Sequence, residues 1–366
     1  MKKVVAFLLI SLFVGLGTAA WIVVEFLNKP PTDSTAAIVF EVSPGESLWG
    51  VAERLYAQGL ITSVKKFVYL GKVLPRYQNV RVGEYELRAN MYPLEVLRVI
   101  SSGKSIERSI TFQEGLNRFE MAEVFERAGF GSKQDFLRAS EDPQLIQQVT
   151  GEKPVSLEGY LFPETYKINK FTGAQGLVKM MVRRFGRVMS EISGLLPAGM
   201  SAHQVVTLAS VIEKETGAPE ERPLISSVFH NRLKLDMRLQ SDPTVLYGIW
   251  VTTGEYKENI TKADLQNPNP YNTYTIKGVP AGPIANPGRE SLLAAVQPAT
   301  SQYLYFVSRN DGTHVFSETY EGHQKAVGEF QLDSRAREGK SWRDLSKQRS
   351  TGSAAGKKEG QDSSAR

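Results

Sequence analysis

The sequence predicts an α+β protein that begins with a membrane-spanning helix. Three observations support this prediction. An uncharged apolar run occupies residues 4–24, and the rest alternates between amphipathic helical stretches and short strand-like stretches in mixed order. Hydrophobic residues make up 41% of the chain and charged residues 23%, as in folded globular proteins. With 366 residues, the chain has room for one large domain or two ordinary ones.

The apolar run at 4–24 is long enough to cross a bilayer, which takes about 20 apolar residues. Lys2 and Lys3 precede it, so residues 1–3 are expected to stay in the cytoplasm. The alternative is a cleaved signal peptide with small residues at 18–20. An uncleaved anchor is favoured because the apolar run continues beyond this site. Either way, the remaining chain lies outside the cytoplasm, and the anchored form is a single-pass protein of the cell inner (cytoplasmic) membrane.

A Pro/Ser/Thr-rich linker is expected at 25–38, followed by a small βα subdomain at 39–108. Residues 40–61 read as a short strand, a turn and a helix, with Ser43 or Ser47 as the helix cap. Further along this subdomain, the pattern predicts a strand at 79–87, with Val80 and Val82 on one face, and a helix at 92–104.

A mixed α+β catalytic domain is expected at 109–345. It contains amphipathic helices at 117–130 and 177–192, and a helix that starts near Ser201 and carries two glutamates. From residue 346 to 366, alanine is the sole apolar residue type, so this basic tail is predicted to be disordered.

The net charge of +5 is concentrated at the two ends of the chain. Residues 331–366 hold nine basic and five acidic residues, and Lys2 and Lys3 add two charges, which leaves about −1 for the body. A nucleic-acid partner usually requires a concentrated basic face, so none is expected. There is no cysteine, and the four histidines form no metal-ligand pattern, so neither a metal nor a cofactor is expected.

The two glutamates lie in "TLASVIEKETG" at 207–217, at the end of a strongly apolar helical run. In a helix over 202–214, Lys214 points away from the apolar face, and Glu213 and Glu215 lie at its two edges. A partly desolvated carboxyl at such an edge can keep a proton near neutral pH and serve as a general acid. The alternative is a pair of solvent-exposed salt-bridging residues. Periodicity does not choose between Glu213 and Glu215.

Four motifs follow one another along the chain: "LASVIEKETG" (208–217), "VFHNRLKLDMRLQSDPTVLYG" (228–248), "YNTYTIKGVPAGPIANPG" (271–288) and "YLYFVSRNDGTHVFS" (303–317). Together, in this order, they resemble the YceG-like (MltG) family of endolytic murein transglycosylases, over about residues 39–330. The segment "VSPGESLWGVAERL" also resembles a LysM-type glycan-binding element, with a purely structural arm as the alternative.

The resemblance implies cleavage of the MurNAc-β-1,4-GlcNAc bond of nascent peptidoglycan, leaving 1,6-anhydro-MurNAc ends and terminating glycan elongation. It implies that the first glutamate of E-K-E-T, Glu213, is catalytic and that Glu215 is a supporting residue. Glu213 would protonate the leaving oxygen and then accept the proton of the muramoyl C6 hydroxyl as it attacks C1. Because the nucleophile belongs to the substrate, the enzyme does not need the second carboxylate of ordinary glycosidases.

The other motifs supply candidate ligands for the sugar. Asp242 precedes Pro243 and is a supporting candidate, with a helix N-cap role as the alternative. The substrate-binding candidates are Gln240, Tyr247, Asn272, Tyr274 and Asn286. The alternative role is turn formation for the two asparagines and core packing for Tyr247.

Two other functions remain open from the sequence. One is a non-catalytic peptidoglycan-binding scaffold, in which the glutamates are boundary residues. The other is a hydrolytic muramidase, which Asp242 or Glu221 near Glu213 would favour. The expected partners are peptidoglycan glycan strands, the membrane through one N-terminal helix, and, at the level of the family, peptidoglycan synthases.

Overall fold

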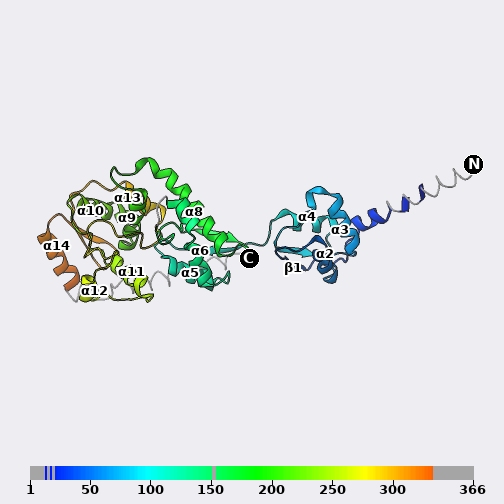
Figure 1. Ribbon diagram of the computed structural model, residues 1–366, viewed down its shortest axis with the longest axis horizontal. Helices are drawn as coiled ribbons and strands as arrows, with labels where there is room; N and C mark the ends of the chain where they lie inside the picture. The colour runs from blue at the N-terminus through cyan, green and yellow to red at the C-terminus, as the bar shows by residue number, and fades with distance from the viewer. Residues whose placement is uncertain (1–12, 15–16, 19–20, 151–153, 333–366) are drawn as a thin grey trace, which may run out of the picture. The chain divides into compact units, whose positions relative to one another are not determined.

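The computed structural model describes residues 13–14, 17–18, 21–150 and 154–332 of the chain (Figure 1). It divides into two compact units. Unit 1 consists of the residues up to 110 together with 166–173, and unit 2 of residues 111–165 together with those from 174 onward. Both contain helices and small sheets, so the predicted α+β class is confirmed.

The predicted membrane span, residues 4–24, lies largely outside the described residues, and residues 1–3 and the predicted tail at 346–366 lie wholly outside them. Residues 21–28 are helical. Within the part of the chain that the structure describes, no helix combines the length and the apolar character that crossing a membrane requires.

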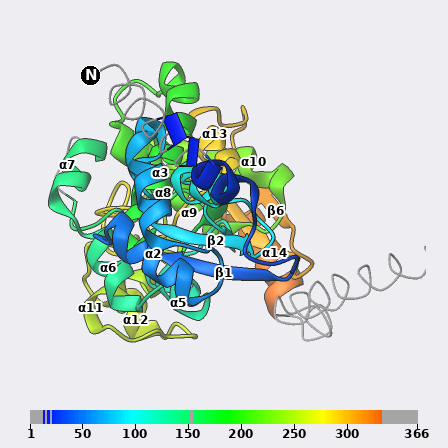
Figure 2. The same cartoon turned by 90° about the vertical axis from the view of Figure 1, so that its right-hand side faces the viewer.

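Unit 1 is built on a two-stranded antiparallel sheet, in which β1 (Ala37–Val42) pairs with β2 (Gly83–Arg88) (Figure 2). Its helices are α2 (Leu48–Ala57), α3 (Val64–Val73) and α4 (Pro93–Ser102), with a 3₁₀ turn at Pro75–Tyr77. The sheet and the helices share one hydrophobic core, which includes Phe40, Leu55, Phe67, Leu87 and Leu97. A LysM-like identity for this unit stays a prediction.

The start predicted for the strand at 79–87 is wrong. β2 begins at Gly83, and Val82 lies ahead of it with an exposed side chain. The backbone N–H of Arg81 donates to the carbonyl of Ile100, at 2.9 Å, so this stretch is bonded to α4 instead of β1. Of the two candidate caps for α2, Ser47 is the one used, because its Oγ accepts a hydrogen bond from Gly50 N.

The segment expected as a linker makes contacts with unit 1. Phe26 is 6% exposed and joins the core of this unit, and the Lys66 ammonium lies 5.7 Å from the centre of its ring. Thr32 N donates to the carbonyl of Ala89, at 3.1 Å. The chain is therefore attached to unit 1 well before β1 begins.

Unit 2 is mainly helical. The strands β3 (Arg108–Thr111) and β4 (Thr165–Ile168) are hydrogen-bonded to each other where the chain passes between units 1 and 2. The helices before the glutamates are α5 (Arg118–Arg127), α6 (Lys133–Ser140), α7 (Pro143–Thr150) and α8 (Gly173–Ile192), with a 3₁₀ turn at Ser193–Leu195.

The helix α9 (Ala202–Glu215) packs against three other helices of unit 2. Every residue from 205 to 212 is buried, so α9 is enclosed on all sides along its middle. Its neighbours are α10 (Arg222–Lys234), α11 (Asp242–Thr253) and α13 (Arg289–Val296). The remaining elements are 3₁₀ turn η3 (Pro219–Glu221), α12 (Lys262–Gln266), the antiparallel hairpin of β5 (Tyr305–Ser308) and β6 (His314–Ser317), α14 (Tyr320–Val327) and a π-helical turn at Gly328–Leu332.

Candidate active site

Glu213 and Glu215 lie in the last turn of α9, where the buried helix reaches the surface of the core. Ser201 caps the other end, because its Oγ accepts from Gln204 N while the Gln204 side chain accepts from Ser201 N. Lys214, between the two glutamates, donates to the carbonyl of Gly115, at 3.2 Å. The two carboxylates consequently face different surroundings.

Glu213 is held in a charged cluster. Its side chain is 5% exposed, and Arg222 Nη2 lies 3.2 Å from its Oε1. Gly288 N donates to its Oε2, at 3.0 Å. Arg222 also lies 3.7 Å from Glu114, and burial together with the charge of Glu213 raises the pKa of the Glu114 carboxyl. Both direct contacts of Glu213 are N–H donors to its carboxylate oxygens.

Glu215 has a different environment. It accepts a hydrogen bond from Ser241 Oγ. Burial raises the pKa of the Glu215 carboxyl to about 7, since it outweighs the Ser241 hydrogen bond, which lowers that pKa. The negative charge of Asp242 adds to the increase, and the positive charge of Arg232 opposes it. Burial thus favours the protonated form of Glu215.

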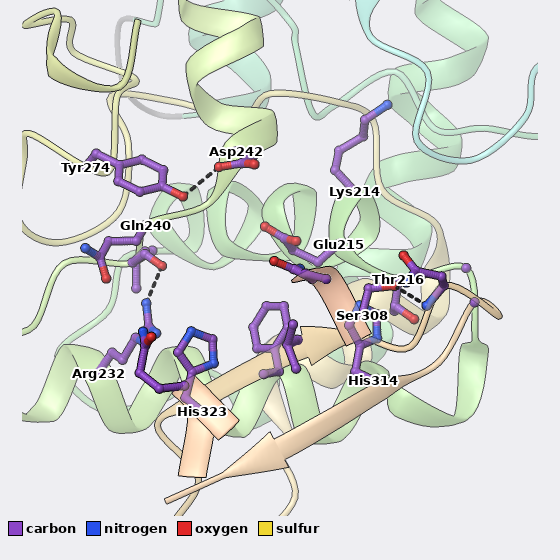
Figure 3. Close-up of a pocket in the computed structure, with 18 of the residues that line it drawn as sticks. Lys214, Glu215, Thr216, Arg232, Gln240, Asp242, Tyr274, Ser308, His314 and His323 are labelled. Carbon is purple, nitrogen blue, oxygen red and sulfur yellow. Dashed lines mark hydrogen bonds between the residues drawn. The ribbon is translucent and has the colours of Figure 1, made fainter. Parts of the chain in front are cut away.

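A cavity of about 950 Å³ opens beside the end of α9 (Figure 3). Lys214 and Glu215 line it from α9 and Thr216 from the C-cap that follows, and Glu213 is not among the lining residues. The remaining walls come from α10, the start of α11 with the two residues at 239–240, Tyr274, the β5–β6 hairpin, α14 and Gln331. Periodicity did not choose between the two carboxylates. In the structure they differ, because Glu215 lines this cavity and Glu213 does not.

Three more of the residues predicted from the sequence line the same cavity: Gln240, Asp242 and Tyr274. Tyr274 Oη donates to Asp242 Oδ1, at 2.6 Å, and burial together with this bond raises the pKa of the phenol. Asp242 is not a helix cap, because Ser241 occupies the N-cap position of α11. Gln240 has a positive φ of 50°, which turns the backbone at the cavity wall.

The wall formed by the hairpin carries His314, and α14 contributes His323. In the view of Figure 3, Glu215 lies between Asp242 and Tyr274 on one side and these two histidines on the other. His314 Nδ1 lies 2.7 Å from Oε2 of Glu221, and His314 N donates to Oε1 of the same carboxylate, at 2.9 Å. Burial lowers the pKa of His323.

Tyr247 and Asn286, predicted to bind substrate, instead bind a buried carboxylate. Tyr247 Oη donates to Oε2 of Glu158, at 2.9 Å, and Asn286 Nδ2 donates to its Oε1, at 2.8 Å. Glu158 is 3% exposed, and burial raises the pKa of its carboxyl to about 7. Asn286 Oδ1 accepts from the backbone of Gly159 and Leu161. Their polar atoms stabilise the core of unit 2.

Asn272, also predicted to bind substrate, is 1% exposed and organises a loop. Its Nδ2 donates to the carbonyls of Asp264, Leu265 and Asn267, and its Oδ1 accepts from Tyr274 N. Asn272 thus has the turn-forming role that was the alternative to substrate binding. Its effect on the cavity is indirect, because it fixes the backbone that carries Tyr274.

A family model described as the YceG-like family matches residues 40–329 of the chain. The chain belongs to the YceG-like family.

Relatives of this YceG-like chain agree with that assignment. It is 31% identical over 322 residues to a Bacillus subtilis (strain 168) protein named an endolytic murein transglycosylase, covering 84% of this chain and 88% of the relative. A protein of the same name from Streptococcus pneumoniae serotype 2 (strain D39) is 26% identical over 339 residues, and the match spans 84% of this chain but 61% of that longer relative. The crystal structure of a putative yceG-like protein from Listeria monocytogenes superposes with a TM-score of 0.54 at 32% identity, covering 79% of this chain and 98% of that one.

Several residues around the two glutamates of this YceG-like chain were not predicted from its sequence. Ser241, Arg222 and His314 were not proposed as parts of the site, and Glu221 was considered only as a second carboxylate near Glu213. Arg232 is 7% exposed and donates to the carbonyls of Arg238, Leu239 and Leu304. The position of Ser241 immediately before the predicted Asp242 was the available signal for one of them.

Proposed function

We propose that this protein is a peptidoglycan lytic transglycosylase that cleaves glycan strands endolytically. The observation that carries the proposal is Glu215, a buried carboxyl with a pKa raised to about 7, on the wall of a cavity of about 950 Å³. A general acid for glycosidic cleavage needs this combination of a retained proton and access to substrate. Family membership and the names of the relatives support the substrate class.

We propose Glu215 as the acid, in place of Glu213. Protonated Glu215 donates to the leaving glycosidic oxygen of the MurNAc-β-1,4-GlcNAc bond. The C6 hydroxyl of the muramoyl residue attacks C1 and closes a 1,6-anhydro ring. This attack is intramolecular and therefore has a large effective concentration. The motif-based prediction of Glu213 stays a prediction, and its ion pair with Arg222 supports a charged, structural role.

Two cavity residues are proposed to bind the sugar around this acid, and a third is a supporting residue. Gln240 offers an amide for an N-acetyl group, and Tyr274 offers a hydroxyl and a ring face for a pyranose. Asp242 supports Tyr274 and Glu215, since it accepts the Tyr274 hydrogen bond and its charge raises the pKa of Glu215. A neutral, protonated Glu215 beside a charged Asp242 is consistent with one proton donor and one supporting carboxylate.

We further propose that residues 4–24 anchor the protein in the cell inner membrane, with units 1 and 2 outside the cytoplasm. The uncharged run of apolar residues after Lys2 and Lys3 supports this location. An enzyme tethered there would cut nascent strands beside peptidoglycan synthases and terminate their elongation. The chain has no cysteine, so a single cysteine can be introduced in unit 2 as a label site. Whether a membrane-impermeant reagent labels it tests the orientation.

The activity is tested with purified full-length protein in detergent, incubated with uncrosslinked glycan strands. Products are identified by mass spectrometry for the wild type, Glu215→Gln and Glu213→Gln, with Glu220→Gln as an exposed acidic control. We expect 1,6-anhydro ends that disappear in Glu215→Gln and persist in the other two. Thermal unfolding of each variant separates loss of activity from loss of folding.

Each contrary outcome has a distinct meaning. Reducing ends in place of anhydro ends would identify a muramidase, and intact strands would favour a glycan-binding scaffold. If anhydro ends persist in Glu215→Gln and vanish in a folded Glu213→Gln, the general acid is Glu213.

A further inference from the structure

The helix at residues 21–28 is attached to unit 1 through its last turn. Phe26 is 6% exposed and belongs to the core of this unit, whereas Val24, the last residue of the apolar run, is 54% exposed. Two helical residues advance about 3 Å along the axis, so the apolar run ends within one turn of the folded unit. A bilayer that holds residues 4–24 therefore lies directly against the surface of unit 1.

The helix α3 lies where the proposed anchor meets unit 1. The Lys66 ammonium is 5.7 Å from the centre of the Phe26 ring, and Figure 1 shows α3 beside the helix at residues 21–28. The opposite side of α3 enters the core of unit 1 through Phe67 and Val68. The outer side of α3 is consequently a surface close to the point where the chain would leave the membrane.

This outer side of α3 combines positive charge with apolar surface. At about 100° per residue, five of its residues fall within about 120° of the helix circumference: Lys65, Lys66, Tyr69, Lys72 and Val73. The Tyr69 and Val73 side chains are 68% and 54% exposed, and the three lysines are exposed as well. These five residues form what we call the basic face of α3.

Positive charge in unit 1 is concentrated around the basic face. Residues 61–83 hold five basic residues and no acidic one, whereas residues 37–60 hold one basic and three acidic residues, and residues 84–110 hold four of each. Among the described residues, the cations of unit 1 that pair with carboxylates lie elsewhere: Arg54, Arg88, Arg108 and Lys170. The charge of the basic face is therefore available to an external anionic surface.

We propose that the basic face of α3 docks on the anionic headgroups of the bilayer that holds the anchor. The inference rests on the proposed anchoring of residues 4–24 and adds an orientation of unit 1 to it. The lysine ammonium groups bind lipid phosphates, while Tyr69 and Val73 lie at the boundary between headgroups and acyl chains, where tyrosine is enriched. The anchor fixes where unit 1 is attached, and the basic face fixes which side of it meets the lipid.

The depth of a single fluorescent probe tests this orientation. Full-length protein is reconstituted in nanodiscs of phosphatidylcholine, with or without phosphatidylglycerol. Because the chain has no cysteine, Tyr69→Cys carries one bimane probe, whose quenching by nitroxide-labelled headgroups is measured. Val39→Cys is the matched control, since Val39 is 58% exposed and alternates along β1 with the buried Phe40, which turns it away from the core. We expect the probe at 69 to be quenched about threefold more strongly in anionic discs, and the probe at 39 equally in both.

Charge variants carrying the probe at 69 separate electrostatic docking from simple proximity to the bilayer. A basic residue near an anionic surface contributes about fivefold to the docking equilibrium, so Lys65→Gln with Lys72→Gln should shift it about 30-fold toward the undocked state. Arg88→Gln removes a positive charge of unit 1 outside α3 and should change the quenching less than about twofold. Salt at about 1 M should abolish the difference between the two kinds of disc.

The contrary outcomes are distinct. Equal quenching at 69 in the two kinds of disc overturns the inference, as does unchanged quenching in the double lysine variant, whose folding is checked by thermal unfolding. A probe at 69 that responds to soluble glycan strands and not to phosphatidylglycerol also overturns it, because the face would then bind a wall polymer. Protein that does not enter the discs overturns the proposed anchor and this inference with it, before any quenching is measured.

Discussion

Ser241 Oγ donates a hydrogen bond to Oε1 of Glu215, and so joins the N-cap position of α11 to the last residue of α9. This bond favours the charged carboxylate and opposes the larger effect of burial. The pKa of Glu215, about 7, is thus a balance between groups that can be changed one at a time.

Removing the Ser241 hydroxyl is expected to move the alkaline limb of activity to higher pH. Glu215 acts in its protonated form, so activity falls as the pH rises through its pKa. Ser241→Ala deletes a bond that lowers this pKa, so the pKa rises further. The measurement is kcat/KM against pH, and a limb that stays in place or moves to lower pH contradicts the proposed acid.

Asp242→Asn should shift the same limb in the opposite direction. The negative charge of Asp242 raises the pKa of Glu215, and asparagine removes that charge. Its side-chain oxygen can still accept the hydrogen bond from Tyr274. The limb is therefore expected at lower pH with product identity unchanged. If both variants shift the limb in one direction, Glu215 is not the group that titrates.

Arg222→Met is expected to destabilise the protein by about 3–5 kcal/mol, because it leaves a buried carboxylate without its cation. Arg222 pairs with Glu213, whose side chain is 5% exposed, and also lies near Glu114. The measurement is the free energy of unfolding in urea.

Arg138→Met is the control for this prediction. Arg138 pairs with Asp135 at the surface, with side chains 71% and 51% exposed, so its loss should cost less than about 1 kcal/mol. Adding Glu213→Gln to Arg222→Met should recover part of the lost stability. Equal costs for the two arginine variants would contradict the structural role assigned to the Glu213 cluster.

Gly159→Ala should destabilise unit 2 by roughly 2–5 kcal/mol, through left-handed backbone strain and overpacking together. Gly159 has a φ of +86°, and an added Cβ would lie 2.5 Å from the Pro283 ring. Gly129→Ala separates the two effects, since Gly129 has a φ of +76° but open space around it. If the urea midpoint falls by the same amount in both variants, the contact with Pro283 relaxes without a cost in stability.

The sequence predicted the helix of the glutamates and its start near Ser201, but helical periodicity did not choose between Glu213 and Glu215. The family resemblance selected Glu213, and that assignment stays a prediction. Because α9 is buried on all sides from 205 to 212, the two glutamates differ by their positions along the axis more than by their angles around it. The last residue, Glu215, lies on the cavity wall.

Polar residues in the motifs were harder to assign. Gln240, Asp242 and Tyr274 line the cavity, whereas Asn272 and Asn286 are buried. A sequence pattern does not distinguish an amide that binds a ligand from one that satisfies buried backbone groups. His314 and Glu221 are separated by 93 positions, so their pairing depends on how β6 and η3 pack and was not predictable from local spacing.

The return of residues 166–173 to unit 1 means that this unit is discontinuous along the sequence. Asn169 Nδ2 donates to Ser105 Oγ, at 2.9 Å, and Lys170 pairs with Glu41, at 2.8 Å. A protein shortened to start at residue 111 would keep these residues but lose their partners Ser105 and Glu41. Unit 1 is consequently no detachable N-terminal module: trimming the chain from that end would leave an orphaned segment inside the sequence of unit 2, and swapping unit 1 between relatives would require exchanging two separate stretches of the gene.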